Sequence, residues 1–177
     1  MSKNCAPAQI KTDRLLLHIL ADEDMFNLID LLINKEVGKT YMVPPLETDD
    51  KKFKLFEAIK RLSYVDDKFV YGIYLNDKLI GLINEVDTDG DTVELGIAIH
   101  PTYKGNGYAT EVLSASFCCL FDMGYTSVKT AAFEENIASI RVMEKCLMTR
   151  LSEITETEYN GKIHKCVWFE KRKEINV

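Results

Sequence analysis

Apolar residues alternate with polar or small ones over positions 92–99, just before a loop that contains two glycines. Val93, Leu95, Ile97 and Ile99 fill every second position, a pattern that predicts a strand with one apolar face. After the loop, apolar residues recur at helical spacing, among them Ala109, Val112, Leu113, Phe117 and Leu120. The pattern therefore predicts a strand, a glycine-bearing loop over 100–110 and a helix that ends near Gly124.

The remaining chain alternates between strand and helix patterns. Strands are predicted over 11–19, 69–75, 79–86, 128–133, 151–159 and 162–170, and helices after Asp22, over 49–62 and from about 137. Asn76-Asp77 and Asn160-Gly161 are typical of two-residue hairpin turns, and the second turn sets Glu156 opposite Lys165 and Ile154 opposite Val167. The Asp-rich segment 87–91 is read as another hairpin turn.

The predicted order of strands and helices contains one parallel crossover. The strand 92–99, the helix 106–123 and the strand 127–133 form a βαβ unit, in which the two strands should be parallel. The other connections are hairpins, so the sheet should be mixed and mostly antiparallel, with about seven strands.

Composition narrows the class of protein. The length of 177 residues suits a single domain, with a core over about 10–170, and the net charge of −6 argues against nucleic acids and anionic membranes as partners. Five cysteines without a C-x-x-C pair suit a reducing cytoplasm. Three scattered histidines argue against a zinc site. No signal peptide and no membrane span are expected.

The loop between the central strand and helix is the candidate binding site. A glycine-bearing turn that opens a helix presents unpaired backbone N–H groups, and the helix dipole favours an anion such as phosphate there. The alternative is an ordinary turn whose glycines only adopt positive φ.

The amino-acid sequence of this loop resembles a motif of a known protein family. Lys104-Gly105-Asn106-Gly107-Tyr108-Ala109 resembles the acetyl-CoA loop of the GNAT N-acetyltransferases, Arg/Gln-x-x-Gly-x-Gly/Ala, and the continuation through Glu111 resembles the RimJ/RimL-like branch. The resemblance extends over about 10–170 and includes these shorter segments: Thr12-Asp13-Arg14-Leu15, Leu79-Ile80-Gly81, Glu94-Leu95-Gly96, and Asn136 with Ser139 and Arg141. It implies an α/β (α+β) fold with helices on both faces of the sheet.

The resemblance also implies a cofactor site. Ile97, Ala98 and Ile99 would line acetyl-CoA, with the Ile97 N–H near the acetyl oxygen. The backbone amides of Lys104, Gly105, Asn106, Gly107, Tyr108, Ala109 and Thr110 would hold the pyrophosphate. Asn136 would lie near the sulfur end of the cofactor, although its residue type and position also suit a helix cap.

Two residues are candidates for catalysis. Glu94 lies on the small, polar face of the central strand and could accept a proton from an incoming ammonium; the alternative is a glutamate on an exposed strand face. Relatives often carry a tyrosine acid at the position of Met143, so Ser139 or water would protonate the thiolate here. Relatives usually have glycine at the position of Leu147, and we expect the helix to end differently in this chain.

The sequence leaves three functions to compare. The leading hypothesis is transfer of an acetyl group from acetyl-CoA to a primary amine, either a protein N-terminus or a small molecule, by direct attack and without a metal. The first alternative is an acyl-CoA-binding protein without catalysis. The second is a dinucleotide-binding module, because Gly105-x-Gly107 follows a strand and Glu134 ends the next one. The oligomeric state is open, with a homodimer as one option.

Overall fold

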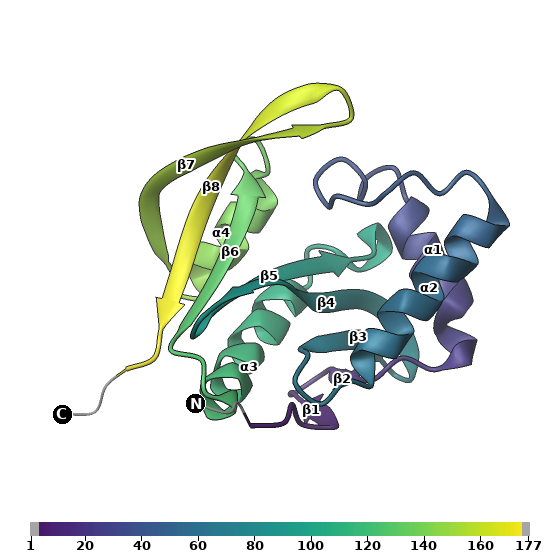
Figure 1. Cartoon of the computed structure of the whole chain (residues 1–177), viewed down its shortest axis with the longest axis horizontal. Helices are drawn as coiled ribbons and strands as arrows, with labels where there is room; N and C mark the ends of the chain where they lie inside the picture. Colours follow the sequence, from purple (N-terminus) through teal and green to yellow (C-terminus); the bar gives the residue numbers. More distant parts are fainter. Residues whose placement is uncertain (1–3, 175–177) are drawn as a thin grey trace.

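The computed structural model describes residues 4–174, which form one sheet with helices on both faces (Figure 1). Within these residues the sheet has eight strands in the order β1-β2-β3-β4-β5-β6-β8-β7. Only β5 and β6 are parallel neighbours. The strands are β1 (Gln9–Lys11), β2 (Leu16–His18), β3 (Val70–Leu75), β4 (Lys78–Asp89), β5 (Thr92–Ile99), β6 (Ser127–Phe133), β7 (Thr149–Tyr159) and β8 (Lys162–Arg172); the α-helices are α1 (Met25–Ile33), α2 (Asp49–Ser63), α3 (Tyr108–Met123) and α4 (Ile137–Lys145). The mixed, mostly antiparallel sheet is confirmed.

The eighth strand comes from a turn that the sequence pattern hid. Of the predicted strand 11–19, only Lys11, the last residue of β1, and Leu16–His18, which form β2, are in strands, because the chain reverses over residues 12–15. The Thr12 amide donates to the Leu15 carbonyl at 2.9 Å, and the Leu15 amide donates to the Thr12 hydroxyl at 2.9 Å. The apolar alternation of Leu15, Leu17 and Ile19 begins inside this turn, so the pattern alone does not show where the strand starts.

The hairpin turns follow their sequence signals, with one exception. Asn76, Asp77, Asn160 and Gly161 all have positive φ, as a type I′ turn requires, and the predicted register of β7 against β8 is confirmed. The segment 87–91 is not a loop throughout. β4 continues to Asp89, which pairs with Thr92, so only residues 90 and 91 form the turn.

The sheet separates two apolar cores. α1 and α2 cover one face and pack on residues that include Val70, Leu82 and Ala98. α3 and α4 cover the other face and pack on residues that include Val93, Leu95, Val128 and Val167. Alternation along β4 and β5 sends successive side chains to opposite cores, which fixes the register of both strands. None of the helices within residues 4–174 has the length and apolar character that a membrane crossing requires.

The parallel pair of strands separates soon after it begins. β5 and β6 are in register only from Thr92 opposite Ser127 to Glu94 opposite Lys129. At the next step the Thr130 hydroxyl donates to the Leu95 carbonyl at 3.0 Å, in place of a ladder bond. Figure 1 shows β6 turning away from β5 beyond this point. The sheet therefore opens into a V along the second half of β5.

The end of α4 contradicts one expectation. Leu147 has φ of 54°, the left-handed conformation that glycine would adopt, so the prediction of a different helix end is wrong. The Met148 amide donates to the Met143 carbonyl at 3.1 Å and the Leu147 amide to the Glu144 carbonyl at 3.0 Å, a Schellman-like closure. Met148 is buried beyond the turn, whereas the Leu147 side chain is 77% exposed and gains little packing.

We expect Leu147→Gly to stabilise the protein. The left-handed conformation costs a leucine about 1–2 kcal/mol, and the greater chain entropy of glycine offsets about 0.5–1 kcal/mol of the relief. Urea denaturation should therefore show a free energy of unfolding higher by about 0.5–1 kcal/mol. Leu147→Ala is the control, because it removes the exposed side chain and keeps the strain. Equal stability of the two variants would contradict this account.

Candidate active site

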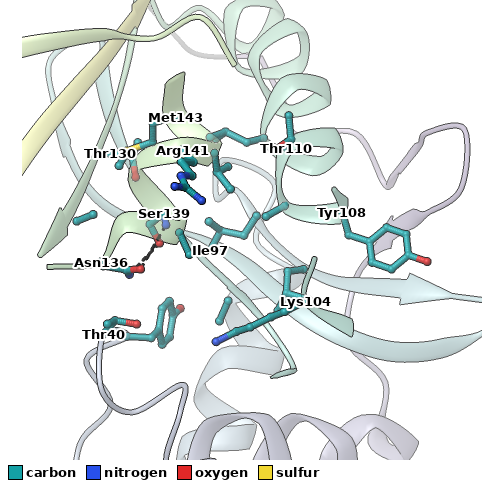
Figure 2. A pocket seen from close by; sticks show the side chains of 18 of the residues that line it. Thr40, Ile97, Lys104, Tyr108, Thr110, Thr130, Asn136, Ser139, Arg141 and Met143 are labelled. Atoms are coloured by element: carbon teal, nitrogen blue, oxygen red, sulfur yellow. Dashed lines mark hydrogen bonds between the residues drawn. The ribbon is translucent and has the colours of Figure 1, made fainter. Parts of the chain in front are cut away.

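A cavity of about 380 Å³ fills the V between β5 and β6 and extends to the start of α3. Figure 2 shows it from close by. Of the residues that the sequence singled out, these line it: Ile97, Ala98, Ile99, Lys104, Gly105, Gly107, Tyr108, Ala109, Thr110, Asn136 and Ser139. Glu94 and Asn106 are the two that do not. The structure therefore brings the predicted loop, strand and helix residues to one place.

Backbone polar groups of β5 face into this cavity. Leu95 directs its carbonyl toward β6, where Thr130 binds it. Successive residues of a strand direct their backbone groups to opposite sides, so Ile97 and Ile99 also direct N–H and C=O toward β6. Within the described chain, β6 offers no ladder partner for them. An extended polar ligand could take that place.

The start of α3 forms the other end of the cavity. Gly105 has φ of 82° and Gly107, the N-cap residue, has φ of 81°, values that glycine adopts without strain. Among residues 4–174, no acceptor binds the amides of the first three helical residues, 108–110. These amides and the helix dipole favour an anion at this end.

Asn106 supports the loop from within. Its side-chain amide donates to the carbonyls of Tyr103, at 3.1 Å, and Lys104, at 3.3 Å. The side chain is therefore engaged in holding the turn, which explains its absence from the cavity wall.

A cluster that we call the Arg14 clamp holds the same loop from outside. The Glu111 carboxylate accepts hydrogen bonds from the Thr12 hydroxyl at 2.6 Å, the Arg14 amide at 2.9 Å and the Arg14 Nε at 2.7 Å. The Arg14 guanidinium also donates to the Asn106 carbonyl at 2.9 Å and lies 4.6 Å from the centre of the Tyr108 ring. Burial acts to raise the pKa of Glu111, but these hydrogen bonds outweigh it and hold the pKa below its usual value. Thr12, Arg14 and Glu111 belong to segments of the sequence that resemble the family. No sequence pattern, however, predicted that their side chains contact one another.

Three cations line the cavity, and no acidic side chain is among its described lining. Lys104 comes from the loop, and Arg141 and Lys145 come from α4, one helical turn apart. None of the three forms an ion pair with another described residue. Figure 2 shows Lys104 and Arg141 reaching toward the same opening. The site therefore suits a ligand with several negative charges, and sequence reasoning assigned no role to the two cations of α4.

The start of α4 carries Asn136 and Ser139. The side-chain oxygen Oδ1 of Asn136 accepts from the Ser139 amide at 3.3 Å, so Asn136 is a helix cap, and its Nδ2 donates to the Ser139 hydroxyl oxygen at 2.9 Å (Figure 2). Both residues also line the cavity. Because Ser139 accepts the bond from Asn136, its hydroxyl hydrogen is left to donate elsewhere. Met143 lines the cavity nearby and has no proton to give.

Glu94 lies on the same face of β5 as Gly96, two residues further on, but only Gly96 lines the cavity. It is opposite Asp87 on β4 and Lys129 on β6. Burial raises the pKa of Glu94, the negative charge of Asp87 raises it further, and Lys129 opposes both. A carboxyl with a raised pKa is a better proton acceptor at neutral pH than an ordinary one.

Together these features describe a cavity between two separating strands that suits a polyanionic ligand. A family model described as acetyltransferase (GNAT) domain matches residues 14–149. The chain therefore belongs to the GNAT acetyltransferase family, and it is an acyltransferase. Within residues 4–174, no cluster of three or more His, Cys, Asp or Glu side chains could hold a metal ion.

Individual relatives agree with the family. The chain is 27% identical over 141 residues to YoaA of Bacillus subtilis, described as an uncharacterized N-acetyltransferase, covering 77% of this chain and 80% of YoaA. A GNAT acetyltransferase structure from Bacillus anthracis superposes with a TM-score of 0.78 at 21% identity, covering 93% of this chain and 98% of that one. RimL, a ribosomal L7/L12 alpha-N-protein acetyltransferase in complex with coenzyme A, has a TM-score of 0.82 at 14% identity, with coverage of 93% and 97%. At these identities the two structures establish the fold.

We expect Asp87→Asn to lower the pKa of Glu94, because it removes a negative charge opposite that carboxyl. A ¹³C NMR titration of the Glu94 carboxyl should show a pKa above the ordinary glutamate value in the wild type and a smaller elevation in the variant. Asp89→Asn is the matched control, since Asp89 lies two residues further along the same strand, opposite Thr92. An unchanged or higher pKa in Asp87→Asn would contradict the electrostatic account.

Proposed function

We propose that this protein transfers the acetyl group of acetyl-CoA to a primary amine by direct attack. One observation carries the proposal: a single cavity joins the anion-binding start of α3 to the unpaired backbone of β5. The pyrophosphate would lie at the amides of residues 104–110, and the amide-bearing arm of the cofactor would bond to Ile97 and Ile99. RimL, which shares the fold, binds coenzyme A.

The reaction assigns a role to each group at the thioester. The neutral amine attacks the carbonyl carbon, and the Ile97 N–H donates to the oxyanion that forms. The C–S bond then breaks, the proton that the attacking nitrogen loses passes through water to the departing thiolate, and the Ser139 hydroxyl donates a hydrogen bond to that sulfur. Glu94 accepts the proton of the ammonium through water, because it does not itself line the cavity. General-base assistance of this kind contributes about 10²–10⁴ in rate.

The acceptor is a primary amine, either a protein N-terminus or a small molecule. RimL is described as an alpha-N-protein acetyltransferase, which favours the first kind, and YoaA carries no stated acceptor. The segment after α1 and the tip of the β7–β8 hairpin flank the amine side: Asn160 donates to the Gly38 carbonyl at 3.3 Å, and the Val43 amide donates to the Tyr159 hydroxyl at 3.4 Å.

Two other functions compete with this one. A Rossmann-type dinucleotide-binding module has a mostly parallel sheet, so the mostly antiparallel sheet of this chain argues against it. The alternative of an acyl-CoA-binding protein without catalysis rests on Met143 in place of a tyrosine acid, and membership of the acetyltransferase family argues against it. Acetyl transfer to any amine would decide against that alternative.

We expect Gly105→Trp to weaken acetyl-CoA binding by at least tenfold, because the indole would occupy the loop where the phosphates lie. Isothermal titration calorimetry measures the affinity directly. Gly90→Trp is the control: both glycines have positive φ and open space beside them, but Gly90 lies at the β4–β5 turn. Unchanged affinity in Gly105→Trp would remove the loop from the binding site.

The pH dependence of the rate tests Glu94. A base works only when it is deprotonated, so kcat/KM should rise with pH through the raised pKa of Glu94. Glu94→Gln should lower kcat by about 10²–10⁴ and abolish that step, while the affinity for acetyl-CoA is kept. A variant whose pH–rate profile matches the wild type would eliminate Glu94 as the base.

A further inference from the structure

A second cavity lies beside the first, on the face of the sheet that α1 and α2 cover. It has a volume of about 150 Å³ and opens between α1, α2 and the segment 41–44. Most of its wall is apolar: Leu32, Leu55, Ile59, Leu62, Val70 and Leu82. Its polar lining consists of Tyr41, Asn84 and Glu85.

The two cavities lie over neighbouring residues of one sheet. Gly96 and Ala98 line the first cavity, and their cross-strand partners Asn84 and Leu82 line the second. Directly opposed residues in an antiparallel pair have Cα atoms about 4.5–5.5 Å apart. A ligand of modest size can therefore reach both cavities at once.

Tyr41 forms the wall between them and lines both. Its hydroxyl donates to the Asn84 Oδ1 at 2.5 Å, and its ring lies 3.4 Å from the place that a Cβ on Gly96 would occupy. Burial raises the pKa of Tyr41, so the hydroxyl stays neutral. The two oxygens of Tyr41 and Asn84 can accept hydrogen bonds from an ammonium at this boundary.

The carboxylate of Glu85 is already paired within the protein, so the second cavity does not offer an unpaired negative charge to a ligand. Lys68 neutralises the Glu85 carboxylate at 2.5 Å, the Phe69 amide contacts it at 3.4 Å, and the side chain is only 6% exposed. The remaining interior is aliphatic. In other proteins an aliphatic and aromatic cavity of about 150 Å³ stays dry and binds benzene.

We propose that the second cavity holds an apolar group of the amine acceptor, about the size of a phenyl ring or a branched aliphatic side chain. The amine then lies beside Tyr41 and above Gly96, where it meets the thioester. This inference rests on the proposed acetyl transfer and adds the class of acceptor: a primary amine with a compact apolar group a short distance from the nitrogen.

Matched acceptors test the inference. With saturating acetyl-CoA, KM for 2-phenylethylamine should be about 10–100-fold lower than for ethanolamine, as the burial of a phenyl group implies. The tripeptides Phe-Gly-Gly and Gly-Gly-Gly should show the same preference if the acceptor is a peptide N-terminus. A preference in only one pair identifies which source of amine the protein uses.

Filling the cavity should abolish the preference. In Ile59→Trp, KM for 2-phenylethylamine should rise to that for ethanolamine, while the affinity for acetyl-CoA stays unchanged. Leu62→Trp, at the half-exposed rim, provides the same test if Ile59→Trp does not fold. Phe53→Trp is the control, because Phe53 is an exposed residue of α2 outside both cavities.

A binding measurement separates this inference from the proposed function. The ¹⁹F NMR signal of 4-fluorophenethylamine should broaden and shift on adding the coenzyme A-loaded protein, and Ile59→Trp or Leu62→Trp should abolish the effect. Acetyl transfer without any preference for apolar amines, or a preference that survives both tryptophan variants, would overturn the inference. Specific binding of the fluorinated amine without transfer to any amine would support the pocket and overturn the proposed function.

Discussion

The early end of the hydrogen-bond ladder between β5 and β6 determines most of what this protein can do. Backbone N–H and C=O groups are costly to leave unpaired, and continuous sheets pair them strand by strand. Here pairing stops after Glu94, and the Thr130 hydroxyl takes over the Leu95 carbonyl. Beyond that point β5 presents polar groups at regular spacing to whatever enters the V. A substrate with amides along its length is the natural complement, and the sheet itself acts as the template.

The charged side chains that line the main cavity are opposite in sign to the net charge of the chain. The chain carries a net charge of −6, yet its main cavity has three cations and no acid among the described lining. A cavity of opposite sign to the molecular surface concentrates the field inside it. An anionic ligand therefore finds a local attraction at the start of α3, and the acidic exterior discourages long polyanions such as nucleic acids.

Elements with local signals were predictable from the sequence. The strand 92–99, the glycine that ends α3 and the two Asn-containing hairpin turns are specified by residues adjacent to one another, and the structure has them at the predicted places. The Arg14 clamp and the contact of Tyr41 with Asn84 join residues that only the folded chain brings together. The prediction for the end of α4 is wrong for another reason. Hydrogen bonds there hold Leu147 in a left-handed conformation that its residue type disfavours.

The Arg14 clamp joins residues 97 positions apart in the chain, so the loop before α3 does not take its shape alone. Coupling of this kind acts in both directions, because two sites that share an equilibrium affect one another equally. A ligand that orders the loop must also order the short β1–β2 hairpin behind it. Slower amide exchange in that hairpin would thus report an occupied loop, and a loosened hairpin would weaken the binding of an anionic ligand at the start of α3.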